Sequence, residues 1–139
     1  MLQKECADRF CAKQGTRQMG AISIFLDHAF ERRPGHRVAR SCFYPAPDVE
    51  SVLLHLERQA NPRQFSRPTR ELIRSIFTQR RKQIGAILKA KARDDQRLAQ
   101  WLDGLATVGA APTTRPEALP AAAWWGLENV LNSRDEVAP

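Results

Sequence analysis

The stretch that most constrains the fold spans residues 41–56, where a proline-rich corner runs directly into an apolar segment. Pro45 and Pro47 fix their own φ angles, lack an amide donor and push the residue before each of them toward extended backbone. The segment that follows contains the apolar residues Val52, Leu53, Leu54 and Leu56. A nearly continuous apolar run is typical of a strand covered on both faces. We therefore predict a stiff corner followed by an interior strand of an α/β sheet over residues 49–56.

The chain before this corner predicts further sheet and two helices. Residues 1–3 resemble the end of a strand, and residues 5–12 have the spacing of a short helix. After a turn around Gly15, residues 22–29 carry apolar side chains at helical spacing, which predicts an amphipathic helix. We expect Pro34 and Gly35 to end that region and residues 37–40 to form a short strand.

After residue 58 the composition shifts to a polar segment with two prolines, residues 59–68, which reads as a linker between subdomains. The remainder carries helical periodicity. Helices are expected from Pro68 to the basic run at 80–82, from Asp94 or Asp95 to about 105, and from 120 to 132. Ile84, Ile87 and Leu88 continue the first of these helices or form a second one, and the tail from Ser133 is expected to fray.

Composition limits the classes of protein to which the chain can belong. Its 139 residues with 42% hydrophobic content suffice for one domain or two small ones. No apolar run has the length of a membrane span, and the N-terminus lacks a signal-peptide pattern. The odd number of cysteines without a CxxC pair predicts reduced thiols in a cytoplasmic protein, and the scattered histidines argue against a metal site: Cys6, Cys11, Cys42, His28, His36 and His55.

The net charge of +7 and the pI near 10 favour a polyanionic partner, either nucleic acid or an acidic membrane surface. The cations are concentrated between residues 63 and 93, where Glu71 is the one acid inside the cluster. A solvated basic face without function is the competing interpretation. The density of the cluster favours phosphate as the partner. The cluster consists of Arg63, Arg67, Arg70, Arg74, Arg80, Arg81, Lys82, Lys89, Lys91 and Arg93.

Five stretches occur in an order and spacing that resemble the small-subunit ribosomal RNA adenine dimethyltransferase family: MLQKECADRF, KQGTRQMGAISI, CFYPAPDVES, IFTQRRKQIGAILK and RPEALPAAAWWGLENVL. The resemblance implies an S-adenosylmethionine-dependent enzyme that dimethylates adenines of the small-subunit rRNA. It also implies the fold, a Rossmann-like methyltransferase domain followed by a small all-α domain. On this basis we expect an α+β fragment. Residues 1–58 would form the rear part of the methyltransferase domain and residues 59–139 the helical rRNA-binding domain.

The resemblance covers only the C-terminal half of a typical family member. The family's glycine-rich cofactor loop, its acidic ribose-binding residue and its asparagine-leucine-proline-tyrosine motif should all precede Met1. The resemblance therefore implies a truncated enzyme in which S-adenosylmethionine is the cofactor of the full-length protein. No cofactor-binding residue is expected in this chain, and we expect it to be inactive alone.

Phe43 matches the family position that stacks on the flipped target adenine. The structural alternative is that Phe43 only anchors the proline corner. Arg80, Arg81 and Lys82 match a basic motif of the family's helical domain that contacts rRNA. Helix-end charge balancing is an equal alternative for Arg80. Together with the cations of the preceding helix, the expected RNA-binding residues are Arg67, Arg70, Arg74, Arg80, Arg81 and Lys82.

Other matching positions are interpreted as scaffold. Arg115 and Glu117 match an arginine-x-glutamate motif before the last helix, which we interpret as a cap or salt bridge, and Gln3, Glu5 and Arg9 are assigned the same way. Tyr44 is expected to cover the strand edge. The chain departs from the family at two places that bear on activity and target: Met19-Gly20-Ala21 replaces tyrosine-glycine-arginine, and Ala39-Arg40 replaces a proline pair.

Two other functional classes stay open. The chain could be a non-catalytic RNA-binding or ribosome-assembly module, or a relative of the large-subunit rRNA adenine methyltransferases. In each case the expected partner is rRNA or a ribosomal subunit precursor and not a membrane. Self-association through an exposed sheet edge is a further alternative.

Overall fold

The computed structural model describes residues 1–133, so most of the tail expected to fray lies outside the described residues. The chain divides into two compact units, which are described separately. The first comprises residues 1–13 and 18–64, and the second comprises residues 14–17 together with the chain from Phe65 onward. Within the described residues, no helix combines the length and apolar character needed to cross a bilayer.

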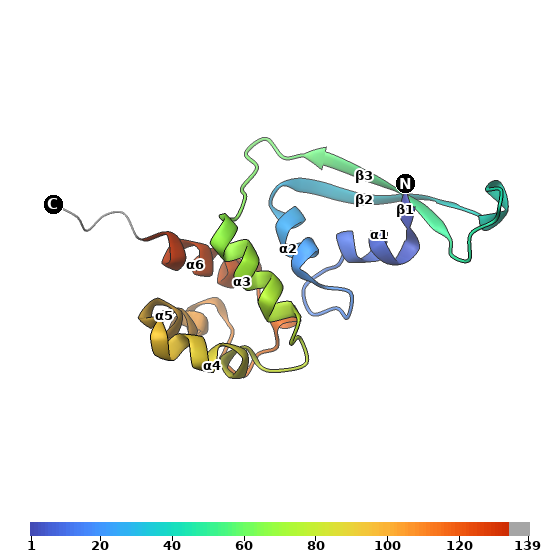
Figure 1. Cartoon of the computed structure of the whole chain (residues 1–139). Coiled ribbons are helices and arrows are strands. Elements are labelled where there is room, and N and C mark those ends of the chain that lie inside the picture. Colours follow the sequence, from blue (N-terminus) through green and yellow to red (C-terminus); the bar gives the residue numbers. More distant parts are fainter. Residues whose placement is uncertain (134–139) are drawn as a thin grey trace. The chain divides into compact units, whose positions relative to one another are not determined.

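The first unit is built on a three-stranded antiparallel sheet with the order β1-β3-β2 (Figure 1). β1 (Leu2–Gln3) pairs with the first two residues of β3 (Ser51–Arg58), and β2 (Phe30–Val38) pairs along the whole of β3. Most of β3 therefore has a hydrogen-bonded neighbour on one side only. The expected α/β sheet is thus antiparallel, and most of it consists of the two paired strands β2 and β3.

β2 corrects the expected path around Pro34 and Gly35. They were expected to end the amphipathic helix, but that helix ends at Asp27, and both residues lie inside β2, at a register shift between Pro34 and Arg37. A bulge at an edge strand tolerates a proline because the missing amide faces no partner. Gly35 is required there, since a Cβ would lie 2.9 Å from the carbonyl oxygen of Leu53. The strand expected at residues 37–40 is the last part of this longer strand.

α1 (Lys4–Phe10) and α2 (Ala21–Asp27) contact each other and lie on one face of the sheet (Figure 1). They bury Val52, which is 5% exposed, whereas Leu53 on the opposite face is 38% exposed. Leu56 lies on the same face as Val52, nearer the end of β3, and is 45% exposed. The prediction that this strand is covered on both faces is wrong for the described residues, because α1 and α2 cover only part of one face and β1 reaches only the start of the strand.

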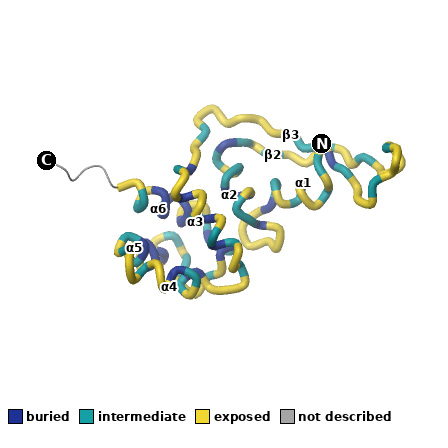
Figure 2. Tube along the Cα trace, in the orientation of Figure 1, coloured by how far each residue is buried: buried dark blue, intermediate teal, exposed yellow. Residues whose placement is uncertain are grey.

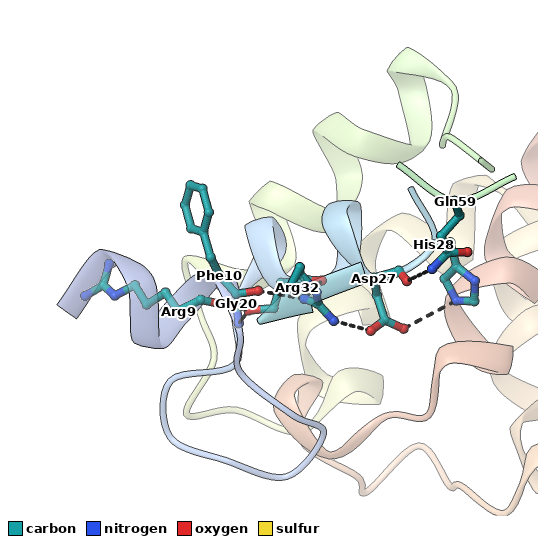
Figure 3. Close-up of polar contacts among 8 residues, drawn as sticks. Arg9, Phe10, Gly20, Asp27, His28, Arg32 and Gln59 are labelled. Carbon is teal, nitrogen blue, oxygen red and sulfur yellow. Dashed lines mark hydrogen bonds and ion pairs between the residues drawn. The ribbon is translucent and has the colours of Figure 1, made fainter. Parts of the chain in front are cut away.

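Arg32 of β2 links the sheet to both helices (Figure 3). Its side chain is only 12% exposed and forms an ion pair with Asp27. Its Nη1 also donates to the carbonyl oxygens of Phe10 (2.7 Å) and Ser23 (3.1 Å). The fully buried Ser23 hydroxyl in turn donates to the carbonyl oxygen of Arg9 at 2.7 Å. This mostly buried guanidinium has three acceptors for its donors, and their bonds fix α1 and α2 against β2.

The second unit is helical. α3 (Arg67–Phe77) has Pro68 in its first turn, where the missing amide has no helical partner, as expected. The open question about Ile84 resolves in favour of a separate helix, α4 (Ile84–Asp94), which α5 (Gln96–Asp103) follows with Asp95 as its N-cap. Two short 3₁₀ helices, Gly104–Val108 and Pro116–Ala118, lead into α6 (Ala121–Asn132).

The core of the second unit is apolar and rich in tryptophan. Trp101 donates its indole N–H to the carbonyl oxygen of Ala123 at 2.8 Å, and the rings of Phe65 and Trp125 stack at 4.1 Å. Residues from all four helices are buried in it, and Figure 2 colours them dark blue along the Cα trace. This unit therefore has its own hydrophobic core. Among its most buried residues are Ile73, Ile76, Ile84, Leu88, Leu105, Leu119, Trp124 and Leu127.

One carboxylate is buried at the start of α3. Glu128 of α6 is 8% exposed and accepts hydrogen bonds from the backbone N–H of Ser66 (2.9 Å), the Ser66 hydroxyl (3.1 Å) and the Asn132 side chain. Burial raises the pKa of Glu128, but hydrogen bonds from Thr69, Ser66 and Asn132 lower it by more, so the net pKa lies below the usual glutamate value. The ionised carboxylate therefore joins α3 to α6.

Replacing Glu128 by glutamine should destabilise the chain by about 1 to 3 kcal/mol, because an amide nitrogen would face groups that donate. The folded-state pKa is lowered, so the carboxylate contributes its stability above the unfolded pKa of about 4.3 and loses it as the pH falls through the folded value. Urea denaturation of both proteins from pH 7 to 3 measures this. The two unfolding free energies should converge at acid pH. The exposed Glu71→Gln is the control and should change little.

Gly85 of α4 should not tolerate alanine, because a Cβ there would lie 2.9 Å from the Cβ of Pro112 and 3.0 Å from its carbonyl oxygen. Backbone cannot move aside cheaply, so Gly85→Ala should cost about 1 to 3 kcal/mol in unfolding free energy. Gly104→Ala is the matched control, since nothing lies within 4 Å of its Cβ position. Equal melting temperatures for the two variants would contradict the close approach at Gly85.

Candidate nucleic-acid interface

The predicted stacking residue Phe43 lies in the loop between β2 and β3, which we call the hairpin tip (residues 39–50). A 3₁₀ turn, Arg40–Cys42, opens the tip, and the amide of Phe43 donates to the carbonyl oxygen of Arg40 at 3.2 Å. Arg40 Nη1 donates across the loop to the carbonyl oxygen of Asp48 at 3.3 Å. The end of the loop, just before β3, is held by a hydrogen bond from the Lys4 amide to the carbonyl oxygen of Glu50 at 2.9 Å. The tip is therefore internally bonded.

The two aromatic rings of the tip differ in exposure. Phe43 is intermediate in exposure, so its ring is not sealed among packed side chains. Tyr44 has a relative exposure of 103%, which contradicts the expectation that it covers the strand edge. Figure 2 shows the tip as largely exposed. Tyr44 precedes a cis peptide bond to Pro45.

In the second unit, the expected RNA-binding cations of α3 lie on its exposed side. Arg67, Arg70 and Arg74 are exposed and spaced at intervals of three and four residues, which places them on one helix face. Arg67 forms an ion pair with Glu71 at 2.9 Å, with both side chains largely exposed. Such an exposed pair is weak and can be exchanged for a phosphate contact.

The second cluster, Arg80, Arg81 and Lys82, lies in the turn between α3 and α4 and not at the end of a helix. Arg81 and Lys82 are exposed, and Lys82 Nζ contacts the Gln79 side chain at 2.9 Å. Arg80 is less exposed and donates to the carbonyl oxygen of Arg17 at 2.7 Å. Its guanidinium thus holds residues 14–17 onto this unit. This contact could not be predicted, because nothing in the amino-acid sequence relates positions 17 and 80.

The positions assigned to scaffold have structural contacts. Glu5 and Arg9 form an ion pair along α1 at 2.7 Å. Glu117 accepts a hydrogen bond through its backbone carbonyl from the amide of Gly15 at 2.7 Å, which helps to attach residues 14–17. Within residues 1–133, Arg115 and Glu117 form no ion pair with each other, so the expected salt bridge is absent there.

Other polar groups offer little chemistry. Burial raises the pKa of Cys11, an effect that Arg32 opposes and Asp8 reinforces, so the thiol stays protonated and is a poor nucleophile. No group of three or more potential metal ligands occurs in the part of the chain that the structure describes. A shallow depression on the β2–β3 ribbon contains Arg33, which Glu31 and Glu57 both pair at 3.2 Å. That pairing makes the depression a poor phosphate site.

Comparison with known proteins identifies the family. The family described as ribosomal RNA adenine dimethylase matches residues 1–117. The ribosomal RNA small subunit methyltransferase A of Opitutus terrae is 50% identical over 128 residues, which are 92% of this chain and 46% of that protein. The protein of the same name from Protochlamydia amoebophila is 35% identical over 120 residues, 86% of this chain and 41% of that protein. The chain thus spans about half the length of the curated relatives it matches.

Two solved structures share the fold. A dimethyladenosine transferase from Plasmodium falciparum matches with a TM-score of 0.69 and 23% identity, over 90% of this chain and 53% of that one. The 23S rRNA methyltransferase ErmE matches with a TM-score of 0.51 and 23% identity, over 93% of this chain and 52% of that one. The α+β arrangement with a small sheet is therefore one found in rRNA methyltransferases. The match over residues 1–117 shows that the chain belongs to the ribosomal RNA adenine dimethylase family.

Proposed function

We propose that this chain is the RNA-holding, C-terminal part of an S-adenosylmethionine-dependent enzyme that dimethylates adenines of the small-subunit rRNA. The observation that carries the proposal is the partly exposed ring of Phe43 at an internally bonded hairpin tip. The residues for which we propose RNA contacts are Phe43, Arg67, Arg70, Arg74, Arg81 and Lys82, with Arg80 in a supporting role through Arg17. The proposed setting is the cytoplasm.

The role of Phe43 follows from what methylation of a base requires. An enzyme that modifies a base must take it out of its stack and hold it while the exocyclic amine meets the methyl donor. Stacking on an aromatic side chain stabilises an unstacked base by about 1 to 3 kcal/mol. Phe43 offers part of its ring to such a base, and the hydrogen bonds of Arg40 with Phe43 and Asp48 keep the backbone in place. Because the backbone of the tip is already ordered, binding would cost mainly the conformational entropy of the flipped adenine itself.

The helical unit suits the RNA backbone. Exposed guanidinium and ammonium groups bind phosphate without reading sequence, and folded RNA is recognised largely by shape and backbone. Arg70, Arg81 and Lys82 are exposed. Because the unit has its own apolar core, these cations are not needed to hold its helices together. They can be committed to an anionic partner at little cost in stability.

We propose that the cofactor is held by residues outside this chain. S-adenosylmethionine would supply the methyl group. A Rossmann-like cofactor site needs a glycine-rich turn between a strand and a helix, but here β1 runs from Gln3 directly into α1 at Lys4. We also propose that the cofactor-binding half covers the side chains left exposed on and beside β3, namely Val49, Leu53 and Leu56.

Two alternatives have specific support. The self-contained core of the helical unit favours a stand-alone RNA-binding or ribosome-assembly module. The fold shared with a 23S rRNA methyltransferase keeps the large subunit as an alternative target. The open edge of β3 beyond Val52 could also pair with a second copy of the chain, so self-association competes with cover by a catalytic half.

The catalytic part of the proposal can be tested in a chimera. The matching 128 residues of the Opitutus terrae protein would be replaced by those of this chain. We expect the chimera to transfer methyl groups from labelled S-adenosylmethionine to small-subunit rRNA and the isolated chain to transfer none. Phe43→Ala in the chimera should lower methyl transfer about five-fold or more, which corresponds to about 1 to 3 kcal/mol of lost stacking, with a smaller change in RNA affinity.

Phe43→Tyr is the control and should keep most of the activity, because it keeps the flat ring. Equal losses of activity and RNA affinity in Phe43→Ala would remove the proposed stacking role. An active isolated chain would contradict the assignment of the cofactor site to residues outside it. A chimera that methylates large-subunit rRNA instead would support the alternative target.

The phosphate part can be tested with the chain itself. Replacing Arg81 and Lys82 together by alanine should weaken binding to small-subunit rRNA fragments and reduce the slope of log affinity against log salt by about one per lost phosphate contact. Fluorescence anisotropy between 50 and 200 mM salt, roughly the range over which such contacts are screened, measures it. Replacing Lys4 and Arg9, which pair with Asp8 and Glu5 on α1, removes the same charge and is the control. Equal slopes for both double variants would mean that Arg81 and Lys82 form only a solvated face.

A further inference from the structure

We propose that Tyr44 is a second stacking position, which holds an unpaired RNA base other than the one held by Phe43. This inference rests on the proposed function, because it takes RNA as the partner of the hairpin tip. It assigns a role to a ring that contacts nothing in its own unit: Tyr44 has a relative exposure of 103%. Among the exposed large apolar residues of the described chain, the next most exposed is Met1, at 63%.

Exposure alone does not make a site, because single apolar side chains on a surface are common. The backbone around Tyr44 adds a second observation. The preceding turn is closed by the bond from the Phe43 amide to Arg40, and Pro45 and Pro47 restrict the residues that follow. A tyrosine side chain has only two χ angles, so a ring presented by ordered backbone loses little entropy on binding. Tyr44 can therefore stack on a flat group such as a base at a small entropic cost.

The two rings differ in what they offer a base. Phe43 is intermediate in exposure, so part of its surface is covered, whereas Tyr44 has a relative exposure of 103%. The backbone bends at residues 43–45, so the two neighbouring residues do not belong to one straight strand. We therefore assign the two rings to two different nucleotides of one loop.

The surroundings of Tyr44 favour a base over an apolar protein surface. The nearby Ser41, Cys42 and Ala46 are exposed and small or polar, and Val49 is the other exposed large apolar side chain of the tip, at 46%, so the apolar surface around the ring is small. An interface with a protein would need a broad apolar patch around its aromatic anchor. The tip carries one cation, Arg40, against the two acids Asp48 and Glu50, so it attracts no phosphate by charge alone. Stacking, which every base can provide, is the interaction left.

The test uses the 139-residue chain and an RNA hairpin whose unpaired loop carries the fluorescent base 2-aminopurine at one position at a time. Stacking quenches this base. Tyr44→Ala should remove the quenching at one loop position, and Phe43→Ala should remove it at another. Tyr44→Ala should also weaken hairpin binding about five-fold or more, while binding to a fully paired RNA duplex stays unchanged.

Two matched variants separate stacking from apolar contact. Tyr44→Phe should behave as the unaltered chain, and Tyr44→Leu should behave as Tyr44→Ala, because leucine is apolar but not flat. Since Tyr44 packs against nothing in its unit, all three should keep the unaltered melting temperature. Leucine that preserves binding would point to an apolar protein partner and overturn the proposal.

Three further outcomes would also overturn it. If the unaltered chain binds the hairpin but Tyr44→Ala changes neither affinity nor quenching, this inference fails and the proposed function stands. If both rings quench the same loop position, the two-base arrangement is wrong. If the unaltered chain binds no RNA hairpin, the proposed function fails and this inference fails with it.

Discussion

The position of the hairpin formed by β2 and β3 depends on the contacts of the mostly buried Arg32 guanidinium. The first unit has a small core whose buried apolar residues include several alanines, so apolar contact alone does little to fix β2 against α1 and α2. Arg32 supplies that link through Asp27 and the carbonyl oxygens of Phe10 and Ser23. Because removing one partner of a buried charge leaves the others uncompensated, this network is hard to alter. The position of the tip that carries Phe43 follows from it.

The helical unit is stabilised differently, and this difference separates binding from stability. Its helices are joined by tryptophan and isoleucine side chains and by the ionised Glu128 beneath α3. Among the cations proposed for RNA contact, Arg80 has a structural bond to another segment, the carbonyl of Arg17. Arg81 lies next to it in the chain but is exposed. Neighbouring residues of one basic run can thus have different roles, one in holding the fold and one in binding, and a count of charges does not distinguish them.

Periodicity predicted the helices well because an apolar face repeats at short range: the expected helix at 120–132 is α6, and that at 22–29 is close to α2. It failed where the answer depends on distant partners. The apolar run at Val52–Leu56 indicates a strand but cannot say which neighbours cover it, and here its second half is exposed. Pro34 and Gly35 were predicted to end a helix, whereas they lie inside β2, where a register shift accommodates them. The exposure of Tyr44 and the bond from Arg80 likewise have no local signal.

The exposed half of β3 sets a physical limit on what can cover it. A strand with an open edge and apolar side chains is prone to pair with other chains. On this ribbon Glu31, Arg33 and Glu57 form a charged group across β2 and β3, which disfavours a second copy wherever like charges would meet. Leu53 lies on the same face of the ribbon as this charged group, because residues 53 and 57 of β3 both alternate with the buried Val52, and Leu53 is 38% exposed. A surface that covers Leu53 must therefore be apolar beside Leu53 and polar beside the charged group, and a catalytic half packed on the face away from α1 and α2 would have to meet both requirements.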